Sequence, residues 1–173
     1  HEPGCELPVV INSGSGNQGI TVSVPLIVSR ATWLSDEQLY RALVLSNLVA
    51  IHQKTGIGRL SAFCGAVCAG AAAGAGIAYL DGGGYCEACH AVVNALSIVA
   101  GMVATREALV RRQDRVLGER GHPGYVMYRD GQQFYGGDGI VKGVENTIDS
   151  IARLGRDGMR ATNDEIIRIM LGA

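Results

Sequence analysis

The sequence predicts an all-α fold, a helical domain with buried Ala- and Gly-rich central helices, and three observations support this. Residues 61–80 contain no charged side chain and are dominated by alanine and glycine, and 86–103 is a second apolar stretch. Aromatic residues make up only 5% of the chain, whereas β-strands favour aromatic and β-branched side chains. The 173 residues suffice for one domain that buries roughly 70% of its unfolded surface.

The N-terminal part holds a short apolar run, a glycine-rich loop and a longer apolar segment. Residues 7–11 are expected to form a strand or a buried extended segment. The loop covers Asn12 to Gly19, and a helix is expected to begin at Gly19 or Ile20. Residues 20–34 are apolar but β-branched and are interrupted by Pro25. Because the chain starts at His1, with residues 4–10 resembling the middle of a protein, we expect the C-terminal part of a longer polypeptide.

Ser35 and Gln38 have the spacing of a capping box at the start of a helix. The helix is predicted to run to about Thr55 and to be ended by Gly56. Its expected apolar positions are Leu39, Leu43, Leu45, Leu48, Val49 and Ile51.

The uncharged segment 61–80 has the length of a membrane span. Alanine and glycine contribute little to membrane insertion, however, and glycines spaced by four residues, as at Gly70 and Gly74, permit close helix packing. We therefore predict a central buried helix and no membrane span. A turn at 81–84 separates it from the helix at 86–103.

The C-terminal third contains a second glycine-rich loop at 136–139 and two further helices. The first is predicted over 144–159 and the second over 162–171, opened by a capping box of Thr162 and Glu165. The last helix is expected to bury four apolar side chains: Ile166, Ile167, Ile169 and Met170. Residues 104–122 are rich in arginine; a solvated helix face is the simplest interpretation of that stretch.

Composition narrows the function classes. The net charge is −1, which gives no indication of the clustered basic face that nucleic-acid binding needs. The chain does not begin with the basic segment and apolar run of a signal peptide. Five cysteines are an odd, clustered set, which favours thiol or metal chemistry over a secreted disulfide framework. We expect a cytoplasmic protein.

The glycine-rich loop from Asn12 to Gly19 is the strongest candidate binding site. Its three glycines between 14 and 19 let the backbone turn with positive φ and approach a ligand closely. Free N–H groups at the start of the following helix would bind an anion such as a carboxylate. The loop adds polar side chains to this cradle: Ser13, Ser15, Asn17 and Gln18. The alternative is a flexible turn without a ligand.

Two patterns concern the cysteines. Residues 86–90 match the haem-attachment pattern C-x-x-C-H, but covalent haem requires export, and a helix that carries two thiols is the alternative. Four cysteines also suggest a four-thiolate zinc site between two helices: Cys64, Cys68, Cys86 and Cys89. Cys64 and Cys68 are one helical turn apart and can face the same way.

Three blocks of sequence resemble a known family. They are PVVINSGSGNQGI at 8–20, GRLSAFC at 58–64 and GDGIV at 137–141. These blocks closely resemble the bacterial L-cysteine desulfidase family, also called serine dehydratase-like because it is related to the α chain of iron–sulfur L-serine dehydratases. The resemblance covers nearly the whole chain except about 104–124, and the first block is long and unusual.

The resemblance implies a catalytic-type helical domain that holds a 4Fe–4S cluster on three cysteines. The open iron acts as a Lewis acid in β-elimination of sulfide from L-cysteine, or of water from L-serine, and the product decays to pyruvate and ammonia. Cys64 matches the first cluster cysteine, and Cys68 is a weak candidate for another. A small amino acid is the expected ligand, and the remainder of the same polypeptide and a second copy of the chain are the expected partners.

The same resemblance assigns the substrate site. Five residues are expected to hold the carboxylate or amino group of the substrate: Asn12, Ser13, Ser15, Asn17 and Gln18. The glycines Gly14, Gly16 and Gly19 shape this loop, and Gly137, Asp138 and Gly139 are expected to line the same site. His52 is a candidate acid or base, although a core or surface histidine is the commoner role.

The other two cluster cysteines of the family belong to a motif, CDGAKxxCAAKI, expected directly after 101–103. Here the arginine-rich stretch takes its place. The codons that 106–116 allow, shifted by one base, can spell AKPSCAAKIA. We interpret 104–123 as a compensated frameshift, which is either real or a sequencing error. Resequencing the gene tests this interpretation. If this sequence is the true one, the rival function is a helical family member without a cluster and without catalysis.

Overall fold

The computed structural model describes residues 7–29, 34–58, 61–100, 123–134 and 143–172, and it confirms the all-α prediction. Within these ranges the chain forms helices and no strand; Asn12 and Ser15 make an isolated bridge. The helices are α1 (Gly16–Ser29), α2 (Asp36–Ile57), α3 (Gly65–Leu80), α4 (Tyr85–Ala100), α6 (Pro123–Arg129), α7 (Val144–Arg153), the π-helical turn η1 (Leu154–Gly158) and α8 (Arg160–Leu171).

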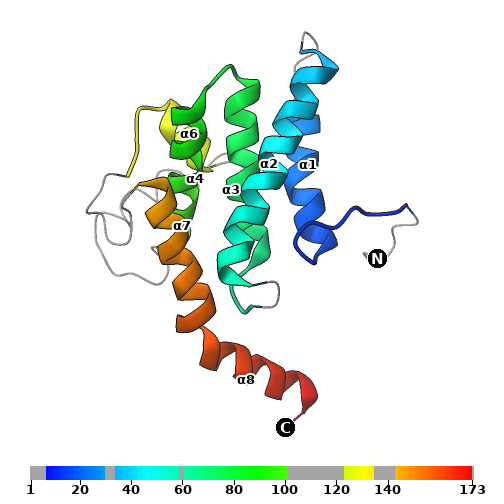
Figure 1. Ribbon diagram of the computed structural model, residues 1–173, viewed down its shortest axis with the longest axis vertical. Coiled ribbons are helices and arrows are strands. Elements are labelled where there is room, and N and C mark those ends of the chain that lie inside the picture. The colour runs from blue at the N-terminus through cyan, green and yellow to red at the C-terminus, as the bar shows by residue number, and fades with distance from the viewer. Residues whose placement is uncertain (1–6, 30–33, 59–60, 101–122, 135–142, 173) are drawn as a thin grey trace.

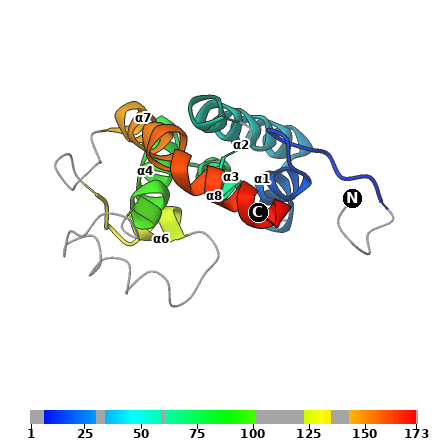
Figure 2. The same ribbon diagram turned by 90° about the horizontal axis from the view of Figure 1, so that it is seen from below.

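Helix α3 lies at the centre of the bundle, as its composition predicted. It packs between α1 and α4, with α2 and α7 along one side and α6 along the other (Figures 1 and 2). All residues from Ala71 to Ala78 are buried. Among the described helices, none combines the length and the apolarity that a membrane crossing requires.

Glycine permits the close approach of α3 to its neighbours. A Cβ on Gly76 would lie 2.6 Å from Cδ2 of Leu26 on α1 and 3.2 Å from the carbonyl oxygen of Ala42 on α2. Protein interiors are packed as densely as organic crystals, so a larger residue would push these helices apart. The Ala- and Gly-rich sequence therefore sets the spacing of three helices at once.

The capping box at the start of α2 is confirmed. The backbone N–H of Gln38 donates to Ser35 Oγ at 3.2 Å, and the backbone N–H of Ser35 donates to Gln38 Oε1 at 2.9 Å. The predicted end at Gly56 is wrong, because α2 continues to Ile57 and stops at Gly58, whose φ is 102°. Gly56 instead serves packing: a Cβ there would lie 2.7 Å from that of Ala152 on α7.

The N-terminal segment differs from its prediction in two ways. Residues 7–11 form neither a strand nor a buried segment, since Leu7, Val10 and Ile11 are exposed. Helix α1 begins at Gly16, three residues before Gly19. The second half of the glycine-rich loop is therefore the first turn of a helix.

Buried Asn94 attaches α6 and the chain after it to α4. Its Nδ2 donates to the carbonyl oxygens of Gly124 at 3.1 Å and Gln132 at 3.3 Å. Its Oδ1 accepts from the backbone N–H of Phe134 at 3.1 Å. One amide thus pairs backbone groups at both ends of this segment, which buried polar groups require.

The last helices depart most from expectation. The predicted helix over 144–159 is α7 followed by η1, and α8 starts at Arg160 with Met159 as its uncapped N-terminal neighbour, so the Thr162–Glu165 capping box does not form. Glu165 pairs with Arg168 instead. The predicted burial of Ile166, Ile167, Ile169 and Met170 is wrong. The reason is that α8 leaves the bundle (Figure 1) and contacts only η1 among the described elements.

Candidate functional site

The first half of the loop is a tight hydrogen-bonded turn. Asn12 and Ser15 exchange two backbone hydrogen bonds of 3.2 Å each. Ser13 and Gly14 adopt positive φ values of 51° and 94°, a conformation that glycine adopts freely and that Ser13 shares here. Ser13 Oγ donates to Asn12 Oδ1 at 2.8 Å. This geometry argues against a flexible linker.

Helix α2 anchors the turn from outside. Asn12 Nδ2 donates to Asn47 Oδ1 at 2.9 Å, and Asn47 Nδ2 donates to the carbonyl oxygen of Leu43 at 2.8 Å. Asn12 is buried, so its amide orients the turn and is not available to a ligand. Sequence reasoning missed Asn47, since an asparagine in a helix gives no signal of its distant partner.

The second half of the loop lies against the start of α3. The side chain of Gln18 covers Gly65 so closely that a Cβ on Gly65 would lie 2.6 Å from its Cδ and Nε2. Gly65 is the first residue of α3, and Cys64 is the residue before it. The fold thereby brings the glycine-rich loop and Cys64, which are far apart in the sequence, to one end of the bundle.

Helices α1 and α3 run in the same direction, so their N-termini lie together at this end (Figure 1). The parallel course follows from the contacts, because Gln18 meets Gly65 and Leu26 meets Gly76. In the described region, the N–H groups of Gly16, Asn17 and Gln18 have no backbone acceptor. Such groups and the helix dipoles favour an anion.

Cys64 and Cys68 differ in their surroundings. Cys64 is exposed at the N-cap of α3. Cys68 is fully buried in the core beside Phe63 and Ile57. Burial raises the pKa of the Cys68 thiol to about 11, although nearby Lys54 opposes the shift.

The cysteines that the structure describes do not fit a cluster held by three thiolates. At the end where Cys64 lies, the second thiol is Cys68, which is enclosed in the core as a neutral thiol. The described residues contain no group of three cysteine, histidine or carboxylate side chains placed to hold a metal ion. The fifth cysteine, Cys5, lies outside the described residues. The expected ligand set for iron is therefore not assembled by the described part of the chain.

The four-thiolate zinc site is not formed. Cys86 and Cys89 lie in the first turns of α4, beside the last turns of α3, whereas Cys64 and Cys68 lie at the start of α3. Because Ala91 of α4 lies beside Gly74 of α3, Cys89 is about eight residues, or roughly 12 Å, along α3 from Cys68, and the two pairs are too far apart to share an ion. His90 of the C-x-x-C-H pattern stacks on Tyr128, with ring centroids 4.9 Å apart.

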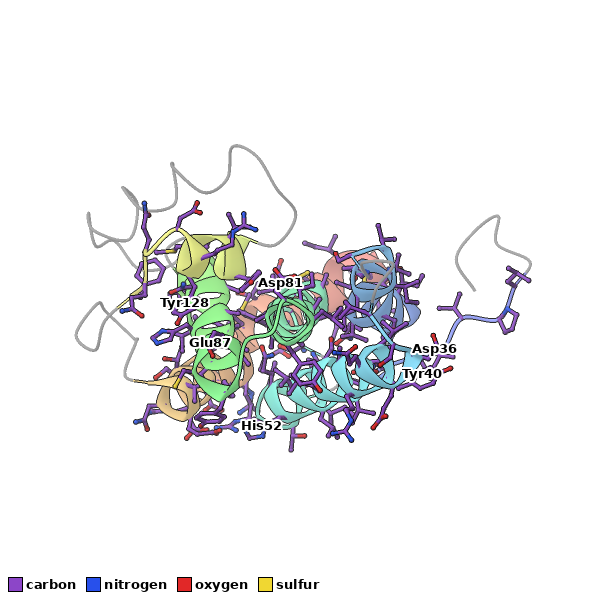
Figure 3. All side chains as sticks on the ribbon, turned by 90° about the horizontal axis from the view of Figure 1, so that it is seen from above. Asp36, Tyr40, His52, Asp81, Glu87 and Tyr128 are labelled. Atoms are coloured by element: carbon purple, nitrogen blue, oxygen red, sulfur yellow. The ribbon has the colours of Figure 1, made fainter. Side chains whose placement is uncertain are left out.

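His52 lies on the outer face of α2, where its Nε2 is 2.9 Å from Glu145 Oε2 of α7 (Figure 3). Its side chain is 56% exposed, which fits a surface histidine. Gly137, Asp138 and Gly139 lie outside the described residues, as does the arginine-rich stretch up to residue 122. A buried lysine, Lys54, was not predicted from the sequence.

A cavity of about 330 Å³ lies at the opposite end of the bundle, between the turn after α3 and helix α6. Its tyrosine and carboxylate groups pair with one another. Tyr125 Oη donates to Asp81 Oδ2 at 2.8 Å, and Tyr128 Oη donates to Glu87 Oε1 at 3.3 Å (Figure 3). These bonds attach α6 to the bundle and pair both tyrosine hydroxyl groups of the cavity with carboxylates; Arg129 also lines it.

Comparison with known proteins gives consistent similarities. The family model of the serine dehydratase alpha chain matches residues 1–105. A UPF0597 protein of Desulfitobacterium hafniense is 58% identical over 171 residues, which are 97% of this chain and 40% of that protein. UPF0597 proteins of Treponema denticola and Lachnoclostridium phytofermentans are each 46% identical over 97% of this chain and 40% and 41% of their own lengths.

The chain thus spans about 40% of the length of the curated relatives that it matches. The family model ends at residue 105, where the arginine-rich stretch begins, whereas the matches to individual relatives cover nearly the whole chain. No solved structure matches this chain.

Proposed function

Because this chain belongs to the serine dehydratase alpha-chain family, we propose that its glycine-rich loop binds the carboxylate of a small amino acid, as the substrate end of a β-eliminating lyase. L-Cysteine is the first candidate substrate and L-serine the second. One observation carries the proposal: Gln18 lies against Gly65, so the loop and Cys64 adjoin at one end of the bundle.

The roles of the loop residues follow from their geometry. Ser13 donates to Asn12 within the turn, and Asn12 donates to Asn47 of α2, so both are proposed to shape the turn. The N–H groups of Gly16, Asn17 and Gln18 point from the start of α1, where a carboxylate is bound favourably. Side chains of Ser15 and Asn17, which are half-buried and exposed, supply further hydrogen-bonding groups to the ligand.

β-Elimination is the chemistry proposed for the whole protein. It removes the α-proton and expels sulfide or hydroxide from the β-carbon, and the aminoacrylate product hydrolyses to pyruvate and ammonia. In the family a 4Fe–4S cluster is expected to assist the leaving group. The described cysteines of this chain do not supply the three thiolates that hold the cluster. We therefore propose substrate binding for this chain, and elimination for family members that have all three cluster cysteines.

Binding and catalysis are tested separately. Titration of the full chain with L-serine or L-cysteine is expected to shift the backbone amide NMR signals of residues 16–18 and 64–66. Unchanged amide signals at millimolar ligand would overturn the proposed site. Anaerobic reconstitution with iron and sulfide, followed by a pyruvate assay, tests the lyase. A chain that binds L-serine but forms no pyruvate and no brown cluster favours the second candidate, a non-catalytic amino-acid-binding family member.

A further inference from the structure

Lys54 is a buried lysine at the end of the bundle where the loop lies. It sits in the last turn of α2 and is only 4% exposed. Lysine is almost never fully buried unless it is paired. Its position follows the buried register of α2, one turn after Ala50 and three residues before Ile57.

The packing of α2 places Lys54 at the level of the first turns of α1 and α3. Helix α2 runs antiparallel to both, since Ala42 meets Gly76 and Gln53 meets Cys68, and α1 is parallel to α3. Ser46 Oγ donates to the carbonyl oxygen of Val22, and Ala50 packs with Val22 and Ala69. One turn further along α2, the corresponding positions are Gln18 on α1 and Gly65 on α3. The influence of Lys54 on the Cys68 thiol agrees with this placement.

Among the residues that the structure describes, none forms an ion pair with Lys54. The enclosed part of Lys54 is its aliphatic stem, because its Nζ is not among the buried side-chain atoms that lack a partner in the described part of the chain. An ammonium group held in this way is available to an anion that binds beside it. The free N–H groups at the start of α1 favour an anion at the same level.

Gln18 has a buried acceptor atom at the same end of the bundle. Its side chain is enclosed, with the residue only 5% exposed, and its Oε1 has no hydrogen-bond donor in the described part of the chain. A buried carbonyl oxygen without a donor is a rare and costly group. It is satisfied by a ligand that brings an N–H donor.

Gln53 also has an unpaired Oε1 in the described region, but its role differs. Its Nε2 donates to the carbonyl oxygens of Cys68 at 3.2 Å and Val49 at 3.3 Å. The bond to Cys68 ties α2 to α3, so the Gln53 amide belongs to the contact between these helices.

We propose that Lys54 and Gln18 together recognise the two charged groups of an α-amino acid, with Lys54 binding the carboxylate and Gln18 Oε1 accepting a hydrogen bond from the ammonium group. This inference rests on the proposed function and adds its recognition mechanism. A simple anion such as inorganic phosphate would satisfy Lys54 and leave Gln18 unpaired. The site therefore selects free amino acids over other anions.

The first test uses the unchanged chain and four probes, measured by calorimetric titration. L-Serine carries both charged groups, N-acetyl-L-serine lacks the ammonium, L-serinamide lacks the carboxylate, and inorganic phosphate is the plain anion. L-Serine is expected to bind at least about tenfold more tightly than each of the others, because each loses one hydrogen bond to a charged group. Equal binding of L-serine and N-acetyl-L-serine, or of L-serine and phosphate, would overturn the inference.

The second test uses variants of the same chain. Lys54→Met is expected to weaken L-serine about tenfold or more and to leave L-serinamide unchanged; Gln18→Met should weaken L-serine and leave N-acetyl-L-serine unchanged. Arg41→Met removes an exposed cation from the same helix and serves as the matched control. Equal losses for all probes would mean that the variants act through folding, and that result sinks the inference.

The two proposals fail in different ways. If the unchanged chain binds no amino acid, the proposed function itself is wrong. If it binds L-serine through residues 16–18 but Lys54→Met binds as tightly, only the recognition mechanism is wrong.

Discussion

Gln18 and Gly65 are in direct contact, and a Cβ on Gly65 would lie 2.6 Å from Cδ of Gln18. Real Cβ atoms essentially never come that close to another heavy atom. Since Gln18 belongs to the first turn of α1 and Gly65 to that of α3, this contact fixes the spacing between the loop and Cys64. The proposed amino-acid site depends on that spacing.

Gly65→Ala is expected to force the end of the Gln18 side chain to move and to destabilise the chain by at most about 1 kcal/mol, because the atoms met are the far end of a side chain and not backbone. Gly70→Ala is the matched control in the same helix, because a Cβ there meets nothing within 4 Å. Alanine is a better helix former, so this control should be neutral or stabilising by up to about 1 kcal/mol. Denaturant unfolding measures both. Equal stability of the two variants would show that Gln18 does not press on Gly65.

The two thiols at the start of α3 should react very differently. Burial raises the pKa of Cys68 to about 11, and the thiolate is the reacting species. At pH 8 its thiolate fraction is about a hundredfold below that of an ordinary thiol, and the enclosing core also excludes the reagent. We expect iodoacetamide to label exposed Cys64 and to spare Cys68 in the native chain, as read by peptide mass spectrometry. Labelling of Cys68 at the rate of Cys64 would contradict the buried placement.

Local signals in the sequence predicted local structure well. The Ser35–Gln38 capping box formed because both groups lie within one turn. The buried α3 was predictable because its alanines and glycines leave no polar face. The end of α2 was not, since Gly56 stays helical by packing against Ala152, a residue distant in sequence.

The sequence was sufficient to predict the loop of the candidate site, but not the residues from distant segments that contact it. The glycines and polar residues of 12–19 indicated a turn followed by a helix, but helix α1 starts earlier because Gly16 continues directly from the turn. The contacts with Asn47 and Gly65 join distant segments, and no periodic pattern encodes them. Lys54 resembles any helical lysine until its register against α1 and α3 is known.

Tyr125 should make the stability depend on alkaline pH. Burial, and to a lesser extent the hydrogen bond to Asp81, raises the pKa of Tyr125 to about 12 in the folded chain. The pKa of a tyrosine in the unfolded chain is about 10. The folded state thus holds this proton more tightly, so its contribution is complete below about pH 10 and is lost as pH rises toward about 12.

Tyr125→Phe tests this by urea unfolding at several pH values. The variant should be less stable by about 1 kcal/mol at pH 8, the value of one hydrogen bond, and the difference should shrink between about pH 10 and 12. Tyr40→Phe, at an exposed position of α2 (Figure 3), controls for loss of a hydroxyl group. A difference that stays constant throughout this alkaline range would show that the proton on Tyr125 is not linked to folding.

Helix α8 should contribute little to the stability of the bundle, since it contacts only η1 among the described elements. Because its apolar side chains are exposed, with Met170 at 80%, they bury little area and contribute little to folding. Deleting residues 160–173 should change the free energy of unfolding by less than about 0.5 kcal/mol, as surface changes usually do. By contrast, Ile151→Ala in the core of α7 should cost about 2–5 kcal/mol.

The same deletion should reduce self-association, since exposed apolar patches drive contacts between molecules. Sedimentation velocity at increasing concentration measures this beside the unfolding experiment. A deletion that costs as much as Ile151→Ala would mean that α8 packs on the bundle or on a second copy in solution. The four apolar side chains that were expected to be buried would then be covered in solution.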